Sequence, residues 1–302
     1  MNLIRVGKVK EVYEVDQNTL EFVFTDKISV FDKIIPSNIP HKGETLCRTA
    51  AFWFQLLKSN GVRTHFTEYI PPNRMRVKRF EVIEDYDKID SETVNYLIPL
   101  EVITRHYAAG SMMDRLKNGS VTAEDLGFPA GHEVRYGEKL PKPYVEVTTK
   151  LEKVDRLLDL DEALDIAGLS GEEYDEIVQT ALRIDSIIDK EVEERLLTHV
   201  DGKKEFGYDE NRQLMVIDTF GTLDEDRWWD TESYASGGSS EELSKEFVRR
   251  HYRDTGYFDE LMKARKEGLP EPDIPPLPDE LIRRVSELYV DMFERITGES
   301  FR

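Results

Sequence analysis

Cysteine is almost absent from this chain. Its 302 residues include a single cysteine, Cys47. No disulfide can therefore form within the chain, and a reducing compartment fits this composition. Cys47 lies in the segment TLCRTAAFWFQLL, where apolar residues recur at helical spacing. We expect it to be a buried small hydrophobe rather than a nucleophile.

Long apolar runs and an excess of positive charge are also missing. No run approaches the roughly 20 apolar residues that a membrane-spanning helix needs, and the first residues, MNLIRVGKVKEV, lack the apolar core of a signal peptide. The formal net charge is -20, and such a field repels nucleic acids and anionic membranes. We predict a cytoplasmic protein that binds neither, although a local cluster of Lys and Arg can still bind a small anion.

Motifs of nucleophilic and zinc-dependent enzymes are missing as well. The chain contains no HExxH, no GxSxG, no Cys/His cluster and no GxxxxGK[ST]. The expected chemistry therefore depends on phosphate, a metal ion and orientation, not on a side-chain nucleophile.

The first hundred residues are typical of an antiparallel sheet with one helix. Residues 46–58 carry apolar side chains at helical spacing and are followed by Asn60-Gly61, which ends a helix. Short runs with strand-like patterns are separated by turn residues such as DQNT and Pro71-Pro72. Strands are predicted at residues 9–15, 20–24, 63–70, 74–83 and 95–108.

The second half mixes helices and strands, so the fold class is α+β. A long amphipathic helix is predicted from a capping box formed by Ser170 and Glu173. Residues 203–209 and 213–220 are expected to pair as strands across the turn ENR. A further capped helix is expected to begin near Ser239.

The C-terminal part contains a linker and a helix. Residues 269–278 include five prolines in ten positions, so this segment is expected to be extended. The final helix is predicted from Asp279 to Ile296, with a stop at Gly298.

A glycine turn near the start is a candidate phosphate site. Gly7 lies between two strand-like segments and is followed by Lys8 and Lys10. Backbone N–H groups in such a turn can approach an anion closely, and the lysines add positive charge. From these residues alone, an ordinary hairpin with surface charge is the favoured alternative.

A second anion site is indicated where a predicted strand ends at Arg105. The small residues of AAGS then lead into a helix that begins near Ser111. A helix N-terminus favours an anion, and Arg105 can bind phosphate with two hydrogen bonds. The alternative is an ordinary helix start in which Ser111 serves as the cap.

A metal site is indicated in the segment DGKKEFGYDENRQLMVID. If its two strands pair across ENR, Glu205 and Asp218 lie close together. Two carboxylates with nucleotide phosphates are a common way to hold Mg²⁺. A pair of surface acids is the alternative. Asp201 and Lys203 in the same segment and Arg227 nearby are further candidates.

Taken together, these segments resemble the SAICAR synthetase family. The resemblance runs in order through GKVKEVY, TDKISVFD, HKGE, PLEVITRHYAAGS, TTKLE, KKEFG, VID and DRWWD, over roughly residues 7 to 230. It implies a kinase-like or ATP-grasp-like antiparallel N-terminal lobe for ATP, residues 1–97, and a larger α/β lobe with C-terminal helices, residues 98–302. It also implies an ATP-dependent ligase that joins carboxyaminoimidazole ribonucleotide to L-aspartate through an acyl phosphate in purine biosynthesis.

The resemblance assigns roles to particular residues and implies ATP and Mg²⁺ as cofactors. Nucleotide contacts fall on Gly7, Lys8, Lys10, Val12 and Lys78. Metal contacts fall on Glu205 and Asp218. Substrate contacts fall on Asp32, Lys42, Arg105, Ser111, Lys150, Asp201, Lys203 and Arg227. Catalytic roles fall on Lys10, Asp201, Lys203 and Arg227. The implied partners are small molecules, and a homo-oligomer is possible.

The chain departs from the family pattern near the reacting groups. Arg156 and Leu157 stand where the family has a His-Asp pair, and Thr219 stands where it has Glu. The residues before Arg227 are Asp224, Glu225 and Asp226, where the family pattern has Asp-Ser-Ser. The segment after about Tyr257 also matches compact family members poorly.

These departures leave other functions open. The first is a related ligase with a different amine or carboxylate. A nucleotide-binding regulator is less favoured, because both candidate metal carboxylates are present. A small-molecule kinase is less favoured, because the sequence contains no HRD or DFG motif.

Overall fold

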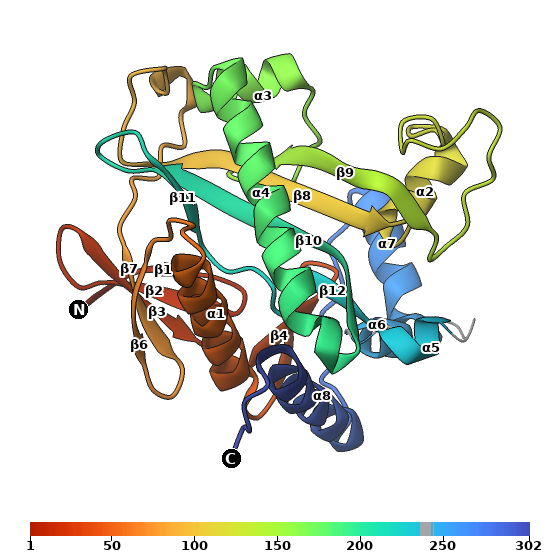
Figure 1. Ribbon diagram of the computed structural model, residues 1–302. Coiled ribbons are helices and arrows are strands. Elements are labelled where there is room, and N and C mark those ends of the chain that lie inside the picture. The colour runs from red at the N-terminus through yellow and green to blue at the C-terminus, as the bar shows by residue number, and fades with distance from the viewer. Residues whose placement is uncertain (236–242, 244) are drawn as a thin grey trace. The chain divides into compact units, whose positions relative to one another are not determined.

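The computed structural model (Figure 1) describes residues 1–235, 243 and 245–302. The chain divides into two compact units. The first unit comprises Met1–Phe52, Thr67–Lys78 and Glu242–Arg302. The second comprises Trp53–Phe66 and Arg79–Glu241. Each unit therefore joins segments that are far apart in the sequence. The division into an ATP-binding lobe and a larger lobe at residues 97 and 98 stays a prediction.

The first unit contains a five-stranded sheet in the order β1-β2-β3-β7-β6. The predicted hairpin around DQNT is confirmed, because Val12 of β2 pairs antiparallel with Phe22 of β3. A separate hairpin is formed by β4 and β5. The strands are β1 (Asn2–Val6), β2 (Lys10–Glu14), β3 (Thr19–Phe24), β4 (Lys27–Val30), β5 (Lys33–Asn38), β6 (Phe66–Ile70) and β7 (Arg74–Lys78).

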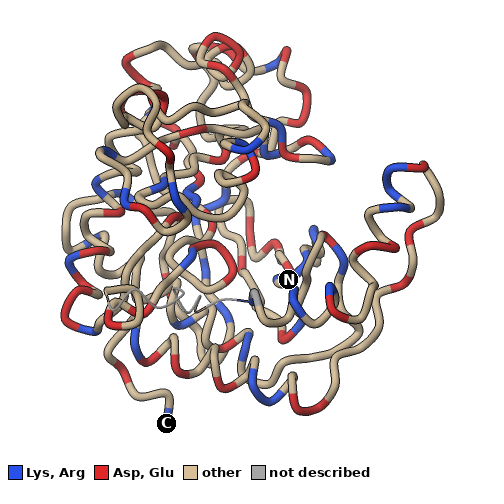
Figure 2. The backbone as a smooth tube through the Cα atoms, turned by 90° about the vertical axis from the view of Figure 1, so that its right-hand side faces the viewer, with Lys and Arg blue, Asp and Glu red and all other residues tan. Residues whose placement is uncertain are grey.

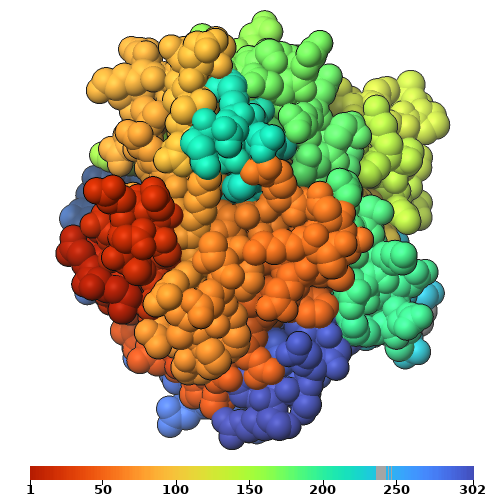
Figure 3. Space-filling view, turned by 60° about the vertical axis from the view of Figure 1, so that its left-hand side comes forward, coloured from red at the N-terminus to blue at the C-terminus, as the bar shows by residue number. Residues whose placement is uncertain are grey.

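Strand β1 is exposed along its whole length, at one edge of this sheet. Its residues lie at the surface (Figure 3). Gly7 follows β1, and its N–H donates to the carbonyl oxygen of Lys10 at 2.8 Å. A Cβ on Gly7 would lie 3.0 Å from that oxygen, so the turn is tight. The glycine turn expected from the sequence is thus present.

The helices of the first unit come from both ends of the chain. Helix α1 (Lys42–Ser59) begins four residues before its predicted start and continues into the second unit. Cys47 on this helix is fully buried, as predicted. The C-terminal helices are α6 (Glu246–Asp254), α7 (Tyr257–Glu267) and α8 (Asp279–Thr297).

Helix α1 is tied to the C-terminal residues within this unit. Arg48 of α1 donates to the backbone oxygen of Phe301 at 3.1 Å, and its guanidinium lies 4.1 Å from the ring centroid of Phe293. Residues 269–278 form no helix or strand, as their prolines predict, and α8 ends at Gly298 with φ 72°. The helix start expected near Ser239 lies outside the described residues.

The second unit contains a sheet in the order β11-β10-β8-β9, with β12 also paired to β10. Strand β10 is long enough to pair with β12 through its first half and with β11 through its second half. The predicted pairing across ENR is confirmed. The strands are β8 (Tyr96–Tyr107), β9 (Lys139–Thr149), β10 (Leu197–Tyr208), β11 (Leu214–Ile217) and β12 (Asp226–Asp230).

Helix α4 (Gly171–Val192) packs on β8 and β10 of this sheet (Figure 1). Its buried positions recur every three or four residues, as an amphipathic helix requires. The capping box of Ser170 and Glu173 is confirmed, with both hydrogen bonds present. Asp185 is the acidic residue on the buried face. The other helices of the unit are α2 (Ser111–Asn118), α3 (Leu160–Ala167) and α5 (Thr231–Ala235), with short 3₁₀ turns η1 (Tyr86–Lys88) and η2 (Glu193–Arg195).

Acidic and basic residues are interspersed along the chain and are not confined to one segment (Figure 2). Among the described helices, none combines the length and apolar content that a membrane crossing needs.

Candidate active site

The candidate site is built on one face of the two central strands of the second unit. Side chains alternate between the faces of a strand. Asp201, Lys203 and Glu205 therefore share one face of β10. On the neighbouring strand β8, Arg105 lies opposite Asp201 and Glu101 lies opposite Glu205. This front face thus carries five charged groups on adjacent strands.

Two guanidinium groups and a helix start meet at one end of the front face. Arg105 donates to Asp201 at 3.5 Å and to the hydroxyl of Ser111 at 3.3 Å. Arg227 of β12 donates to the same carboxylate oxygen of Asp201. Both arginines and the N-terminus of α2 favour an anion at this corner. The sequence-based prediction that Arg105 and Ser111 lie together is confirmed.

Gly110 allows this close arrangement. Its φ is 57° and its ψ is −138°, a backbone conformation that side chains disfavour. A Cβ at this position would lie 2.5 Å from Nη2 of Arg227. Only a residue without a side chain lets the guanidinium rest against the helix start. Ser111 is not the helix cap, because Gly110 holds that position and makes no side-chain cap bond.

Glu146 is a neighbour of Arg105 that sequence reasoning missed. Its Oε1 accepts hydrogen bonds from Nε and Nη2 of Arg105 at 2.9 and 2.7 Å. Its Oε2 accepts from Arg115 of α2. Glu146 thus fixes one edge of the Arg105 guanidinium. The signal was available, since Glu146 is an acid within the otherwise strand-like run YVEVTT.

The two candidate metal ligands lie beside one ammonium group. Glu205 pairs with Ile217, the last residue of the adjacent strand β11, so Asp218 comes directly after the end of that strand. Lys150 forms an ion pair with Glu205, and its Nζ lies 3.9 Å from Oδ2 of Asp218. The prediction that these carboxylates come together is confirmed. A cation already lies against both groups, and oxygen ligands of this kind suit Mg²⁺.

The backbone of Asp218 has an uncommon conformation. Its φ is 58°, a value found in few residues other than glycine. Such conformations cost about 1–3 kcal/mol and concentrate at functional sites. The conformation supports a role for the position of this carboxylate.

Lys203 is surrounded by carboxylates. Its Nζ lies 2.7 Å from Glu101, 3.4 Å from Glu225 and 3.7 Å from Glu205. Burial opposes the charge, but Glu225, Glu205 and Glu101 outweigh it and raise the pKa of Lys203. Burial raises the pKa of Glu101, and Lys203 partly offsets this. Lys203 is therefore a permanent cation at neutral pH, suited to bind an anionic group and not to act as a base.

The predicted nucleotide residues of the first unit lie around the β1–β2 turn and on its sheet. Lys8 pairs with Asp32 at 2.5 Å, and both side chains are exposed. The ammonium of Lys10 lies 4.6 Å from the ring centroid of Phe22. Val12 is half-buried in β2, and Lys78 is half-buried at the end of β7.

Lys42 differs from the other predicted substrate residues in its burial. It is the first residue of α1, it is fully buried, and its Nζ lies 5.2 Å from the ring centroid of Tyr289. A cation over an aromatic face is stabilised by the ring. Its role in substrate binding stays a prediction.

Comparisons with known proteins decide the family. A model described as SAICAR synthetase matches residues 3–264. The chain belongs to the SAICAR synthetase family. It is 54% identical over 301 residues to the phosphoribosylaminoimidazole-succinocarboxamide synthase of Thermoplasma acidophilum, and the match covers 100% of both chains. The residues after Tyr257, which fall outside the resemblance, are thus shared with this relative.

Solved structures of the SAICAR synthetase family have the same fold. The SAICAR synthase from Saccharomyces cerevisiae complexed with SAICAR has a TM-score of 0.77 at 25% identity, covering 99% of this chain and 95% of that one. A type-2 SAICAR synthetase in complex with ADP has a TM-score of 0.69 at 26% identity, covering 99% of each chain. The predicted α+β fold is confirmed.

The structure shows what surrounds three of the residues that depart from the SAICAR synthetase pattern. Arg156 is half-exposed and forms ion pairs with Glu152 and Glu162 at 3.1 and 2.8 Å. Leu157 next to it is exposed. Thr219 is buried, and its hydroxyl donates to Asp218 at 3.4 Å. Thr219 therefore contacts Asp218, a candidate metal-binding residue. Arg156 instead forms its ion pairs at the surface.

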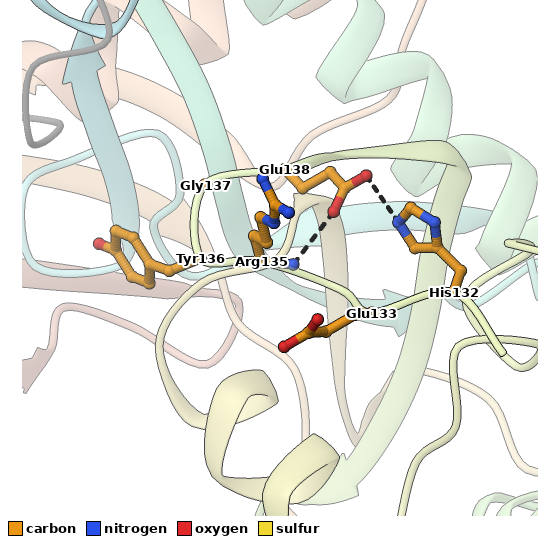
Figure 4. Close-up of a pocket in the computed structure, with 6 residues that line it drawn as sticks. All are labelled: His132, Glu133, Arg135, Tyr136, Gly137 and Glu138. Atoms are coloured by element: carbon orange, nitrogen blue, oxygen red, sulfur yellow. Dashed lines mark hydrogen bonds and ion pairs between the residues drawn. The ribbon is translucent and has the colours of Figure 1, made fainter.

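A surface hollow elsewhere in the second unit contains no predicted site residue. In Figure 4 the ring of His132 faces the carboxylate of Glu138, at 2.8 Å. The N–H of Arg135 donates to the same carboxylate at 3.0 Å. Glu138 is thus held by its own loop, and the candidate site remains the front face of β8 and β10. The hollow is lined by His132, Glu133, Arg135, Tyr136, Gly137 and Glu138.

Proposed function

We propose that this chain catalyses ATP-dependent formation of an amide between carboxyaminoimidazole ribonucleotide and L-aspartate. The observation that carries this function is the front face itself: Arg105, Ser111 and Arg227 form an anion-binding corner, and Glu205 and Asp218 form a carboxylate pair on the same sheet. A phosphorylated substrate and a metal-bound nucleotide need these two kinds of group. The full-length relative named as this synthase supports the assignment.

The alternative of a related ligase with another amine or carboxylate is not supported. It rested on Arg156, Leu157 and Thr219. The relative at 54% identity over the full chain is named as the synthase itself. Arg156 forms its ion pairs at the surface. The presence of Arg156 where the family has another residue therefore changes a loop and not the front face.

The reaction divides into two steps. The carboxylate oxygen of the ribonucleotide attacks the γ-phosphorus of ATP, and the bond to ADP breaks. The amine of aspartate then attacks the acyl carbon, a proton leaves the nitrogen, and inorganic phosphate departs. Positive groups stabilise the oxygens of the phosphoryl group during its transfer. The site also holds the reactants in a fixed orientation, which lowers the entropic cost of bringing them together.

The roles of the front-face residues follow from their contacts. Arg105 and Ser111 bind the ribonucleotide phosphate, with Arg227 beside them. Asp201 holds both guanidinium groups in place. Lys203, a permanent cation, attracts the reacting carboxylate or the transferring phosphoryl group.

The cofactor assignments complete the proposal. Glu205 and Asp218 would hold Mg²⁺, which when bound neutralises phosphate charge. Lys150, already between these carboxylates, would turn to a phosphate or carboxylate of the substrates. Gly7, Lys8, Lys10, Val12 and Lys78 would contact ATP, and Asp32 and Lys42 a substrate. A cytoplasmic location and a possible homo-oligomer stay predictions from the sequence.

The decisive experiment measures ADP release with Mg-ATP and carboxyaminoimidazole ribonucleotide, with and without aspartate, and identifies the product by mass spectrometry. We expect ADP release that depends on aspartate, and the succinocarboxamide as product. Release of ADP with a phosphorylated product and no need for an amine would indicate a kinase. No release of ADP at all would refute the proposal.

A further inference from the structure

The face of β8 and β10 opposite the candidate site holds a buried charged cluster, which we call the back-face cluster: His106, Asp185, His199, Lys204 and Asp226. Two of its members directly follow site residues in the sequence, since His106 follows Arg105 and Lys204 follows Lys203. His106 contacts Asp185 of α4 at 3.0 Å, and Lys204 forms an ion pair with the same carboxylate. The back-face cluster therefore fixes the strands that carry the site.

Asp226 lies at the centre of this arrangement. In the sheet it is the direct partner of Gly202 on β10. Its Oδ2 lies 2.7 Å from Nε2 of His199, and its Oδ1 accepts a hydrogen bond from the N–H of Gly221 at 2.8 Å. Its side chain is 0% exposed. A Cβ on Gly202 would lie 2.0 Å from Oδ2, so the carboxylate lies directly over this glycine.

The two sequence neighbours of Asp226 point to the other face. Glu225 lies 3.4 Å from Lys203, and Arg227 forms an ion pair with Asp201. Glu225, in the turn before β12, and Arg227, on β12, thus both reach the front face, while Asp226 between them reaches the back face. The back-face anchor sets the register of both front-face contacts.

We infer that Asp226 is a positioning residue for the ribonucleotide site. Held by His199 and by the backbone of Gly221, it fixes Arg227 and Glu225 against Asp201 and Lys203. The inference rests on the proposed function. Arg227 remains partly exposed, with 20% of its side chain accessible, so a shift of the strand at Asp226 would move its guanidinium within the site.

Two variants test this role from opposite sides. Asp226→Asn keeps the shape of the side chain but loses its charge and one acceptor. Gly202→Ala removes no polar group from the chain but displaces the Asp226 carboxylate by a clash. We expect each to raise the KM for carboxyaminoimidazole ribonucleotide by about tenfold to hundredfold, with the KM for ATP within about twofold, because a displacement near 1 Å has such effects.

A matched control is Gly171→Ala at the start of α4, where a Cβ would meet nothing within 4 Å. It should leave both KM values unchanged. In the double variant Asp226→Asn/Arg227→Ala, the KM for the ribonucleotide should be no higher than in Arg227→Ala alone, because Asp226 acts through Arg227. Thermal unfolding of each variant separates loss of folded protein from loss of binding.

The outcomes are distinct. An unchanged KM for the ribonucleotide in Asp226→Asn, with a rate lowered only in proportion to the folded fraction, would make Asp226 a structural residue and overturn the inference. If that variant does not fold, Gly202→Ala decides by the same criterion. Wild-type protein without aspartate-dependent ADP release would instead refute the proposed function.

Discussion

Gly110 offers the sharpest test of the anion-binding corner. In Gly110→Ala the new Cβ would lie 2.5 Å from Nη2 and 2.6 Å from Nη1 of Arg227, so the guanidinium has to move. The backbone conformation costs about 1–3 kcal/mol for a residue with a side chain. A hydrogen bond to a charged group contributes about 1.5–3 kcal/mol, which corresponds to about a tenfold to hundredfold change in affinity.

The two costs have separate measurements. The backbone cost should lower the free energy of unfolding in denaturant. The displacement of Arg227 should raise the KM for the ribonucleotide in initial-rate assays, with the KM for ATP nearly constant.

Gly119 provides the control, because it ends the same helix. It also has positive φ, 77°, but a Cβ there would meet nothing within 4 Å. Gly119→Ala should therefore lower stability and leave the KM unchanged. Equal KM values in the two variants would refute the role of Gly110 and the place given to Arg227.

The remaining predictions each concern one group. Lys10→Ala should raise the KM for ATP more than that for the ribonucleotide in initial-rate assays; equal effects would argue against a phosphate contact. Glu205→Gln should abolish Mg²⁺ binding measured by calorimetry with ATP present, and unaltered binding would place the ion elsewhere. Lys204→Met should lower the free energy of unfolding in urea by about 3–5 kcal/mol, because it removes the ammonium partner of the buried Asp185 carboxylate; a loss below about 1 kcal/mol would contradict this. His199 has a raised pKa because its hydrogen bond to Asp226 and the nearby carboxylates outweigh burial, so its stabilisation is present below about pH 6.5 and lost as the pH rises through its folded pKa. His199→Gln should remove that part of the pH dependence of unfolding, and an unchanged profile would show that His199 does not contribute.

Local features of the sequence predicted much of the fold. The capping box at Ser170 and the stop at Gly298 lie within a few residues of the helix ends that they define, so no tertiary information was needed. The strand pair around ENR is a hairpin, and its pairing brought Glu205 and Asp218 together as expected.

Contacts between distant segments were not predictable in the same way. Arg105 was expected to be available to phosphate, but one edge of its guanidinium is held by Glu146, 41 positions away. Glu101 and Glu225 around Lys203 were likewise missed as partners, because strand alternation tells which face a residue occupies but not which strand lies beside it. The alternative interpretation of Ser111 as the helix cap was wrong, because Gly110 is the N-cap residue of α2.

The first unit is built from segments near both ends of the sequence, and this affects the order in which the chain folds during synthesis. Arg48 contacts Phe301, so the first unit is complete only after the residues around Phe301 have been synthesised. Residues 79–241 of the second unit are all synthesised before that moment. Contacts between residues that are far apart in the sequence form slowly. We therefore expect the second unit to fold first during synthesis, while the N-terminal segment waits for its C-terminal helices.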